Sequence, residues 1–404
     1  MKQIINKISI ILYAVYFHLL YYRPKSEEKN KNILILYNGI IGDTVLLADY
    51  LMMFQRIFQP QNGYQIEVLC LKSCKKMLMS FFKKQYQVKF LDVFIDDTVK
   101  TWGGYKKVVH FFRDKYYQKI FVLPIANPRA DRLVYNIPGK EKIVCGENDT
   151  PGKWGFPYLY HRYFYEHAYN TRIQNPMGTM EIRRYADLIR RYADFPVPVK
   201  ISHMKVVEGI TVSEKYCVIG LGASTSEKTW ETSKFLEIIH YLWNKYHLVS
   251  YLCGEEKERY LYEQIEKTGK CDYIKSYIGK TSFQEWISLI KGASLYVGND
   301  SAGVHIAASV SVPSIVIVGK WQYKRFFPYD KGLEKENEIL PYPVFSELQY
   351  ECINCREKHM KKGIGNRECK KAIKAGRPCL CVADVTVAQV KDAVDQTIVK
   401  YDIQ

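Results

Sequence analysis

The sequence predicts an α/β protein with two domains, each built around a parallel sheet. Three observations support this: short apolar runs alternate with helical stretches, the alternation occurs in both halves, and a Pro-broken segment, FPVPVK at 195–200, separates them. Continuous apolar runs are typical of strands buried on both faces, and strands that alternate with helices usually pair in parallel. A chain of 404 residues also exceeds one comfortable core.

We expect three segments along the chain. Residues 1–30 form an apolar helix and a linker, residues 31–198 the first sheet domain, and residues 199–404 the second domain with a Cys-rich tail and a final helix. Residues 146–180 are rich in aromatics, Gly and Pro, which favours irregular structure there.

The expected elements of the first domain begin with the apolar strand NILILY at 32–37, a Gly-containing turn and a helix. Strands are expected at 66–71, 88–90 and 119–123, with helices at 73–83, 105–116 and 181–193. In the second domain, strands are expected at 216–220, 248–253, 274–277, 294–298 and 314–318, with helices at 233–246, 257–267, 283–291 and 302–309.

The charge balance is basic, with 59 Lys and Arg against 42 Asp and Glu and a formal net charge of +17. This favours an acidic ligand or an anionic membrane surface. No signature of a nucleic-acid-binding module is present, so we expect no nucleic-acid partner. The 11 cysteines are an odd number in a long mixed chain, which suits a reducing compartment such as the cytoplasm.

The N-terminus carries one long apolar stretch, Ile4 to Tyr22, with Lys2 and Lys7 at its start and Arg23 and Lys25 just beyond it. It is only just long enough to span a bilayer, and polar residues interrupt it. Aromatic residues crowd its second half, as at a membrane interface. Two interpretations stay open with equal weight: a helix lying on the cytoplasmic leaflet, and a helix packed on the protein itself. A membrane span ranks third.

Two segments follow strands and carry polar chemistry. In GIIGD, Gly42 and Asp43 lie where a strand opens into a helix, so Asp43 is either a functional carboxylate or a helix cap. In GLGASTSEKTW at 220–230, hydroxyls and a lysine follow glycines, a composition that can surround phosphate oxygens. The alternative is a polar surface loop. The candidate residues of this loop are Ser224, Thr225, Ser226 and Lys228.

Two further segments follow strands of the second half. In CGEEKE, Glu256 and Glu258 either accept ribose hydroxyls or form a charged first helical turn. In GNDSAGVH, Asp300 ends a strand and Ser301 opens a helix whose first N–H groups suit a diphosphate. The other candidates in this segment are Ala302, Gly303 and His305, the last of which is equally a structural hydrogen bonder.

In this order and spacing, GIIGD, GASTSEKTW, GEEKE and NDSAGVH resemble the heptosyltransferases of glycosyltransferase family 9. The resemblance covers residues 31–395. It implies a GT-B fold, with two Rossmann-like domains facing across a cleft. It also implies inverting transfer of a heptose or related sugar from an ADP-heptose-like nucleotide diphosphate sugar to a lipopolysaccharide core or other lipid-linked acceptor, at the cytoplasmic face of the inner membrane.

The resemblance implies three catalytic residues. Asp43 would be the base, Lys228 would stabilise the leaving diphosphate, and Asp300 would help to orient the sugar. No metal or other cofactor is implied. Two departures concern the pocket: Ala302 replaces a usual glycine, and GKWQYKRFFP at 319–328 replaces a usual Gly-Pro-Thr turn. The alternatives are an inactive nucleotide-sugar-binding or scaffold protein and, behind it, a dinucleotide-dependent sugar-modifying enzyme, although neither glycine-rich loop fits GxGxxG.

Five cysteines gather near the C-terminus in a CxxC…C…CxC arrangement. Zinc prefers four thiolate or imidazole ligands, but the CxC spacing is unusual for such a site. Similar cysteine strings near the C-terminus are typical of the family that the chain resembles, and this resemblance implies a structural staple rather than a catalytic feature, with a bound metal as the alternative. The five are Cys352, Cys355, Cys369, Cys379 and Cys381.

Overall fold

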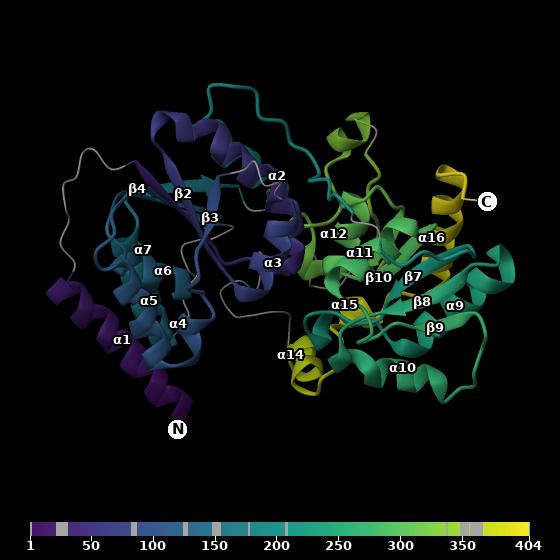
Figure 1. Ribbon diagram of the computed structural model, residues 1–404. Helices are drawn as coiled ribbons and strands as arrows, with labels where there is room; N and C mark the ends of the chain where they lie inside the picture. The colour runs from purple at the N-terminus through teal and green to yellow at the C-terminus, as the bar shows by residue number, and fades with distance from the viewer. Residues whose placement is uncertain are drawn as a thin grey trace. The chain divides into compact units, whose positions relative to one another are not determined.

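The protein, seen here in a computed structural model, divides into two units, Met1–Val199 and Lys200–Gln404 (Figure 1). Each unit contains one six-stranded sheet in which all neighbouring strands pair in parallel. The predicted α/β class with two parallel sheets is therefore confirmed. The structure describes residues 2–21, 31–81, 87–123, 128–147, 155–176, 178–206, 209–336, 338–347, 355 and 367–403.

The first sheet has the strand order β3-β2-β1-β4-β5-β6. Its strands are β1 (Asn32–Tyr37), β2 (Gln65–Cys70), β3 (Val88–Phe90), β4 (Tyr117–Leu123), β5 (Gly139–Glu147) and β6 (Thr171–Asn175). The helices of this unit are α1 (Lys2–Tyr21), α2 (Ile41–Ile57), α3 (Lys72–Phe81), α4 (Asp97–Lys100), α5 (Trp102–Phe112), α6 (Pro128–Asn136), α7 (Gly155–Ala168) and α8 (Glu181–Arg190), with a 3-10 turn, η1 (Pro60–Asn62).

The expectation of irregular structure at 146–180 is wrong, because this region contains α7 and β6. Pro157 lies in the first turn of α7, where a missing N–H group costs no helical hydrogen bond. Phe164 and Ala168 of the same helix are buried. The glycine and proline that suggested irregularity therefore mark the start of a helix.

The second sheet has the order β12-β11-β10-β7-β8-β9. Its strands are β7 (Tyr216–Gly220), β8 (Val249–Cys253), β9 (Ile274–Ser276), β10 (Leu295–Asn299), β11 (Ser314–Ile317) and β12 (Tyr342–Val344). The helices are α9 (Thr232–Tyr246), α10 (Arg259–Glu266), α11 (Phe283–Gly292), α12 (Ala302–Ser309), α14 (Arg367–Lys374), α15 (Leu380–Ala383) and α16 (Val387–Lys400), with 3-10 turns η2 (Ser226–Lys228), η3 (Glu256–Glu258), η4 (Lys320–Gln322) and η5 (Lys331–Glu336).

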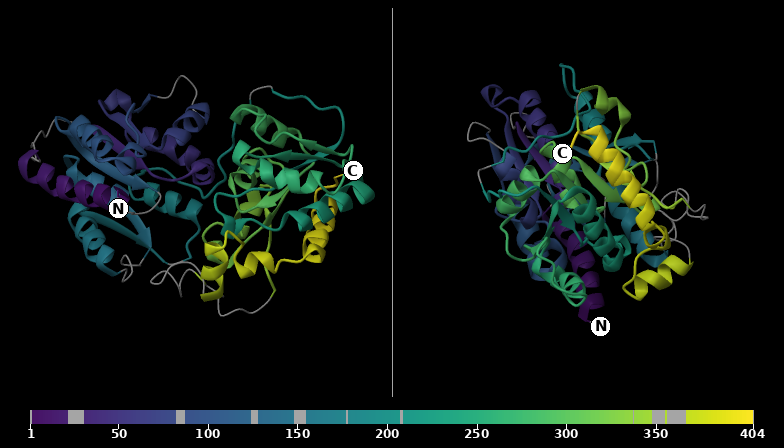
Figure 2. Two further views of the ribbon diagram at one scale, coloured as in Figure 1. Left: turned by 90° about the horizontal axis from the view of Figure 1, so that it is seen from below. Right: turned by 90° about the vertical axis from the view of Figure 1, so that its right-hand side faces the viewer.

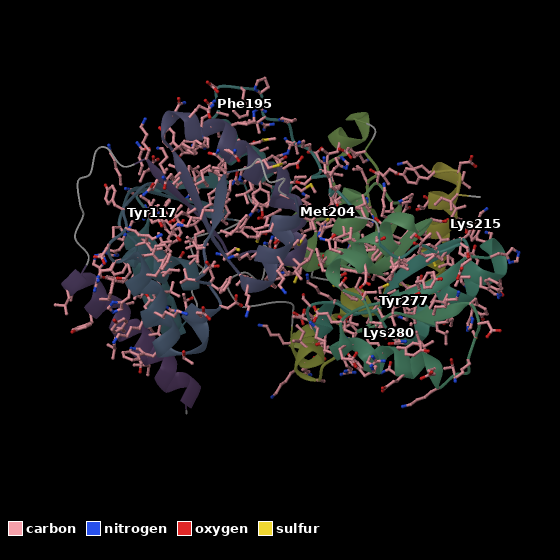
Figure 3. The ribbon with its side chains drawn as sticks, viewed as in Figure 1. Tyr117, Phe195, Met204, Lys215, Tyr277 and Lys280 are labelled. Atoms are coloured by element: carbon pink, nitrogen blue, oxygen red, sulfur yellow. The ribbon has the colours of Figure 1, made fainter. Side chains whose placement is uncertain are left out.

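Each sheet is buried beneath apolar helix faces. In the first unit, Leu34 and Leu36 of β1 share a core with side chains of α1, α5 and α6. In the second unit, α16 packs against α9, β11 and β12, and Figure 2 shows it alongside the sheet. Burying apolar area in this way is the main favourable term in the folding of both units. Figure 3 shows the side chains, with Tyr117 labelled in the first unit, where it is fully buried.

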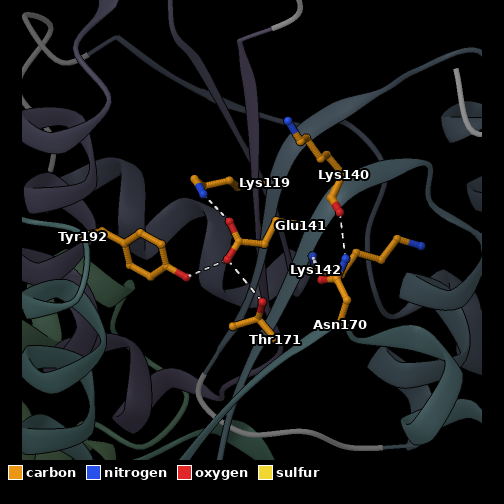
Figure 4. Close-up of polar contacts among 7 residues, drawn as sticks. All are labelled: Lys119, Lys140, Glu141, Lys142, Asn170, Thr171 and Tyr192. Carbon is orange, nitrogen blue, oxygen red and sulfur yellow. Dashed lines mark hydrogen bonds and ion pairs between the residues drawn. The ribbon is translucent and has the colours of Figure 1, made fainter. Parts of the chain in front are cut away.

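The amino ends of the strands in the first sheet are tied by polar clusters. Glu141 of β5 accepts hydrogen bonds from Thr171 Oγ1 and Tyr192 Oη, each 3.2 Å long, and pairs with Lys119 of β4 (Figure 4). Nearby, Asn170 accepts from the Lys142 N–H group at 2.8 Å. Because ligands of open α/β sheets bind beyond the carboxyl ends, these contacts join strands rather than form a site.

The N-terminal helix α1 lies along α5 and α6 of its own unit (Figure 1). Its side chains Ile10, Ala14 and Phe17 are at most 2% exposed. Within the residues that the structure describes, no helix has the length and apolar character needed to cross a membrane.

Candidate active site

Three of the sequence motifs meet at the carboxyl edge of the second sheet. Gly220 at the end of β7 pairs in register with Cys253 at the end of β8 and with Gly298 of β10. Since these strands are neighbours, the segments that follow them, 221–230, 254–258 and 300–305, leave the sheet side by side. The structure thus brings together most of the predicted donor-binding residues.

The loop after β7 is fixed at both ends by Asn299, a residue that the sequence analysis did not select. The Asn299 side chain accepts a hydrogen bond from the Trp230 N–H group and donates one to the Leu221 carbonyl, both 2.8 Å long. The Trp230 indole donates in turn to the Val385 carbonyl at 2.9 Å. Asn299 is fully buried. One feature of the sequence could have identified Asn299: it is a polar amide at the end of an apolar strand. A buried amide at such a position requires hydrogen-bond partners.

Lys228 and Asp300 form an ion pair inside this edge. Lys228 Nζ lies 2.8 Å from Asp300 Oδ2, and the two side chains are 21% and 5% exposed. Screening of the two charges by dissolved salt is weak at such a partly buried position. The pair therefore places a fixed cation beside the start of α12, already balanced by one carboxylate.

The hydroxyl residues of the loop are accessible. Ser224 and Thr225 are exposed and Ser226 is partly exposed. The Lys228 N–H group donates to the Thr225 carbonyl at 3.2 Å, which closes the turn η2. Hydroxyl groups and the Lys228 ammonium consequently occupy one short turn, an arrangement suited to phosphate oxygens.

Tyr296 explains several glycines of the motifs. A Cβ atom on Gly220 or Gly303 would lie 2.2 Å from the Tyr296 hydroxyl oxygen, and one on Gly298 would lie 2.8 Å from it. Tyr296 is buried, and this burial raises the pKa of its hydroxyl. These glycines are therefore required for close approach. Tyr296 carries no recognisable signal in the sequence, because an aromatic residue within a strand looks like ordinary core.

The structure explains why an alanine is tolerated at position 302, next to the required Gly303. Gly303 is the position where a side chain would strike Tyr296, whereas Ala302 is partly exposed at the start of α12. Ser301 precedes the helix in an extended conformation, with φ −146° and ψ 178°. The substitution of a usual glycine at 302 therefore meets no steric obstacle from Tyr296.

The two glutamates of the third motif differ. The Glu258 carboxylate lies so close to the first loop that a Cβ atom on Gly222 would be 2.0 Å from its Oε1 atom, and burial raises the pKa of Glu258. Glu256 is instead mostly exposed and pairs with Arg259, whose guanidinium lowers the pKa of Glu256. Only Glu258 reaches the polar loop after β7.

His305 is enclosed by aromatic rings. Its Nδ1 atom lies 2.7 Å from the Tyr329 hydroxyl, and its ring stacks on Phe327 at 5.3 Å. Burial lowers the pKa of His305 to about 4, so the imidazole is neutral at pH 7. This matches the structural interpretation: His305 anchors the 319–329 segment, whose sequence departs from the usual turn.

Four C-terminal cysteines share a cavity of about 80 Å³ with Lys228 and Asp300. The Cys379 N–H group donates to the Glu227 carbonyl at 3.0 Å, and Cys381 Sγ accepts from the Lys320 N–H group at 3.3 Å. The cysteines therefore support two loops at the sheet edge, residues 221–230 and residues 319–328. The four are Cys355, Cys369, Cys379 and Cys381, while Cys352 lies outside the described residues.

The described ranges contain no group of three or more His, Cys, Asp or Glu side chains arranged to hold a metal ion. A larger cavity, of about 560 Å³, lies behind the loop at the start of α9 and is lined by Ser226, Trp230 and Arg377 among others. It does not include Lys228 or Asp300, so we place the candidate site at the sheet edge.

In the first unit, Asp43 lies in the first turn of α2 and is 8% exposed. Its Oδ2 atom accepts the Ile40 N–H group at 3.0 Å, so the helix-cap interpretation is correct for this contact. Gly39 is required here, because a Cβ atom would lie 2.2 Å from the Tyr37 hydroxyl. Gly42 is buried in the same turn. Burial and the Asp43 carboxylate keep the pKa of Tyr37 well above its usual value.

Comparison with known proteins gives a consistent answer. The model of "Glycosyltransferase family 9 (heptosyltransferase)" matches residues 151–354. Lipopolysaccharide heptosyltransferase 3 of Escherichia coli strain K12 is 27% identical over 165 residues, which is 41% of this chain and 46% of that protein. A second E. coli protein of that name is 29% identical over 123 residues, 36% of its length. The matches thus span less than half of these curated relatives.

Solved structures show the same fold over a longer range. E. coli ADP-heptose lps heptosyltransferase II has a TM-score of 0.60 and 15% identity, covering 92% of this chain and 99% of that one. E. coli heptosyltransferase WaaC with ADP-2-deoxy-2-fluoro heptose has a TM-score of 0.58 and 14% identity, covering 90% and 99%. Because the sequence identities are only 14–15%, these comparisons show a shared fold and nothing further.

Proposed function

Because the chain belongs to glycosyltransferase family 9, the heptosyltransferase family, we propose that it transfers a sugar from a nucleotide diphosphate sugar to a hydroxyl group of a cell-surface glycan. The observation that carries the proposal is the meeting of Lys228, Asp300 and Glu258 at the carboxyl edge of the second sheet. This is where open α/β sheets bind nucleotides.

We propose an ADP-heptose-like donor, since a related structure is described with an ADP-heptose analogue. Glu258, as a carboxylate, would accept the ribose hydroxyls. The diphosphate would lie against the hydroxyls of 224–226, the Lys228 ammonium and the first N–H groups of α12, all of which favour negative charge. Ala302 and Gly303 leave room at that helix start, while His305 supports it from behind.

The proposed reaction is an inverting displacement. The acceptor oxygen attacks the anomeric carbon of the donor, its proton passes to the Asp43 carboxylate, and the bond to the diphosphate breaks with the electron pair remaining on the phosphate oxygen. Lys228 would stabilise the charge that builds on the leaving group, and Asp300 would orient both Lys228 and the sugar. A divalent metal is not required in this scheme, because Lys228 and backbone N–H groups supply the positive field.

For the acceptor we propose a lipopolysaccharide core or another anionic lipid-linked glycan. Residues 70–119 hold 12 basic and 4 acidic side chains, which suits such an acceptor. We place the protein at the cytoplasmic face of the inner membrane, as a peripheral protein. The curated relatives are named for lipopolysaccharide, which supports both parts of this proposal.

Donor binding and sugar transfer can be tested in separate experiments. Thermal shift with ADP, UDP and NAD would identify the nucleotide, and we expect ADP to raise the melting temperature. Release of ADP from ADP-heptose, measured with and without a lipopolysaccharide core acceptor, then tests transfer. Binding without acceptor-dependent release would indicate an inactive binding protein, and stabilisation by NAD alone would indicate a dinucleotide enzyme.

A further inference from the structure

The helix α1 has two apolar faces with different environments. Ile10, Ala14 and Phe17 are buried against the first unit. On the opposite face, five large apolar side chains are 50–77% exposed and are spaced three or four residues apart, except for the adjacent last two. This spacing places them in one row along the helix. The row, here called the outer stripe, consists of Ile8, Leu12, Tyr16, Leu19 and Leu20.

The orientation of the outer stripe is fixed by contacts on the inner side. The Tyr13 hydroxyl lies 2.8 Å from His110 Nε2, and the Tyr13 ring packs edge-on against Trp102 at 5.3 Å. Near the other end, His18 Nδ1 lies 3.1 Å from the Tyr135 carbonyl. These contacts reach both α5 and α6. The outer stripe is therefore part of a packed helix and faces outward as one surface.

Cations and an aromatic residue border this surface. Trp102 is 40% exposed beside Tyr13, and Lys106 Nζ lies 5.3 Å from the centre of the Trp102 ring. Lys107 is exposed on the same helix. The sequences of α1 and α5 contain no Asp or Glu. An apolar row with an exposed Trp and cations is the composition of a helix that lies in a membrane interface.

We propose that the outer stripe docks the first unit onto an anionic lipid surface, with α1 lying in the plane of the leaflet. One face of α1 is occupied by its own unit, so the helix rests on the membrane without crossing it. A second copy of the chain is a poorer occupant, because two copies would bring the same cations together. An anionic lipid surface interacts with both features: its acyl region buries the apolar row, and its headgroups attract the cations.

The inference gives the proposed peripheral location a specific surface, but it does not depend on sugar transfer. Deleting residues 1–25 is not a clean test, since Ile10, Ala14 and Phe17 belong to the core and their loss would expose apolar surface. Substitutions confined to the outer stripe change only exposed positions. The matched control is Val399→Glu, because Val399 is 81% exposed on α16 of the other unit.

The test is co-sedimentation of the full-length protein with vesicles of phosphatidylglycerol and phosphatidylcholine, without donor or acceptor. We expect Leu12→Glu/Leu19→Glu to lower the vesicle-bound partition coefficient at least tenfold, and Lys106→Glu to lower it about fivefold. Val399→Glu should bind like the unaltered protein. Melting curves verify that the variants are folded.

Equal binding by Leu12→Glu/Leu19→Glu and the unaltered protein would overturn the proposal, as would equal binding to vesicles of phosphatidylcholine alone. Sedimentation equilibrium without vesicles provides the third arm. A dimer of the unaltered protein that Leu12→Glu/Leu19→Glu abolishes would assign the surface to a second copy instead. Because no sugar donor is present, any of these failures leaves the transferase proposal intact.

Discussion

The carboxyl edges of the two sheets are built in different ways. In the first sheet, Asp43 depends on one turn, in which its own carboxylate caps the helix that carries it. In the second, residues from three neighbouring strands meet, and Asn299 ties the loop that holds Lys228. In the function proposed above, the first edge therefore places its chemical role on one side chain, whereas the second edge shares donor binding among several.

The sharpest test of this contrast is Asp43→Asn. The amide oxygen can still accept the Ile40 N–H group, so the helix cap is retained while the proposed base is lost. We expect transfer to fall by about 10²–10⁴-fold with little change in ADP affinity or melting temperature. Steady-state ADP release and calorimetric titration measure the two effects.

Asp43→Ala is the matched control, because it removes the cap as well as the proposed base. We expect it to lose the same activity and, in addition, about 1 kcal/mol of stability. If Asp43→Asn retained near-normal turnover while Asp43→Ala was destabilised, Asp43 would be a helix cap only.

Acid should affect the second unit through His305. Burial lowers its pKa to about 4, against about 6.5 in an unfolded chain. Between these values the unfolded state binds more protons, so stability is lost as pH falls from about 6.5 to about 4. The full difference corresponds to roughly 3 kcal/mol.

The measurement is urea unfolding at several pH values for the unaltered protein and for His305→Gln. Since Asp300 and Lys228 are present in both proteins, the difference between the two pH profiles isolates the imidazole. We expect a shallower loss of stability in His305→Gln over this range. If the two proteins lost stability in parallel as the pH fell, protonation of His305 would not affect the free energy of unfolding.

Lys228→Ala should weaken ADP binding by about 10- to 100-fold, the range expected for charged hydrogen bonds of about 1.5–3 kcal/mol. The substitution also leaves the Asp300 carboxylate buried without its cation, which repels the diphosphate. The double variant Lys228→Ala/Asp300→Asn removes that charge and should recover part of the affinity. Calorimetry with ADP on both variants separates the contributions, and an unchanged dissociation constant in Lys228→Ala would place the diphosphate elsewhere.

The smallest expected effect concerns the packing around Tyr296. Gly220→Ala would place a Cβ atom 2.2 Å from the Tyr296 hydroxyl oxygen, and we expect a loss of about 1–3 kcal/mol in the free energy of unfolding. Adding Tyr296→Phe removes that oxygen and should restore much of the stability in urea unfolding. A double variant no more stable than Gly220→Ala would show that Gly220 is needed for another reason.

Much of the fold could be predicted from the sequence. Apolar runs fix strands such as Asn32–Tyr37, whose predicted bounds agree with the structure. The meeting of the motifs could also be anticipated, since each follows a strand. The region 146–180 could not, because its Gly-Phe-Pro segment signals a break in sequence but starts a helix in the structure.

The supporting residues of the site were harder to find. Asn299 contacts Trp230 and Leu221, and Tyr296 contacts Gly220, all about 70 to 80 positions away, and local periodicity carries no information on such partners. The two faces of α1 illustrate the same limit. The sequence left docking on the membrane and packing on the protein as alternatives, because an apolar stretch does not reveal how much of its circumference the fold will bury.

The Asn299 tether also bears on the timing of donor binding. A loop that must be ordered by its ligand costs about 1–2 kcal/mol for each residue fixed. Here the chain between Leu221 and Trp230 is held at both ends by Asn299 alone, without the proposed donor. The entropy of arranging its ends was therefore lost during folding, and encounter with the donor need not wait for loop closure. Asn299→Ala would shift that cost to the binding step, slowing association rather than only hastening release.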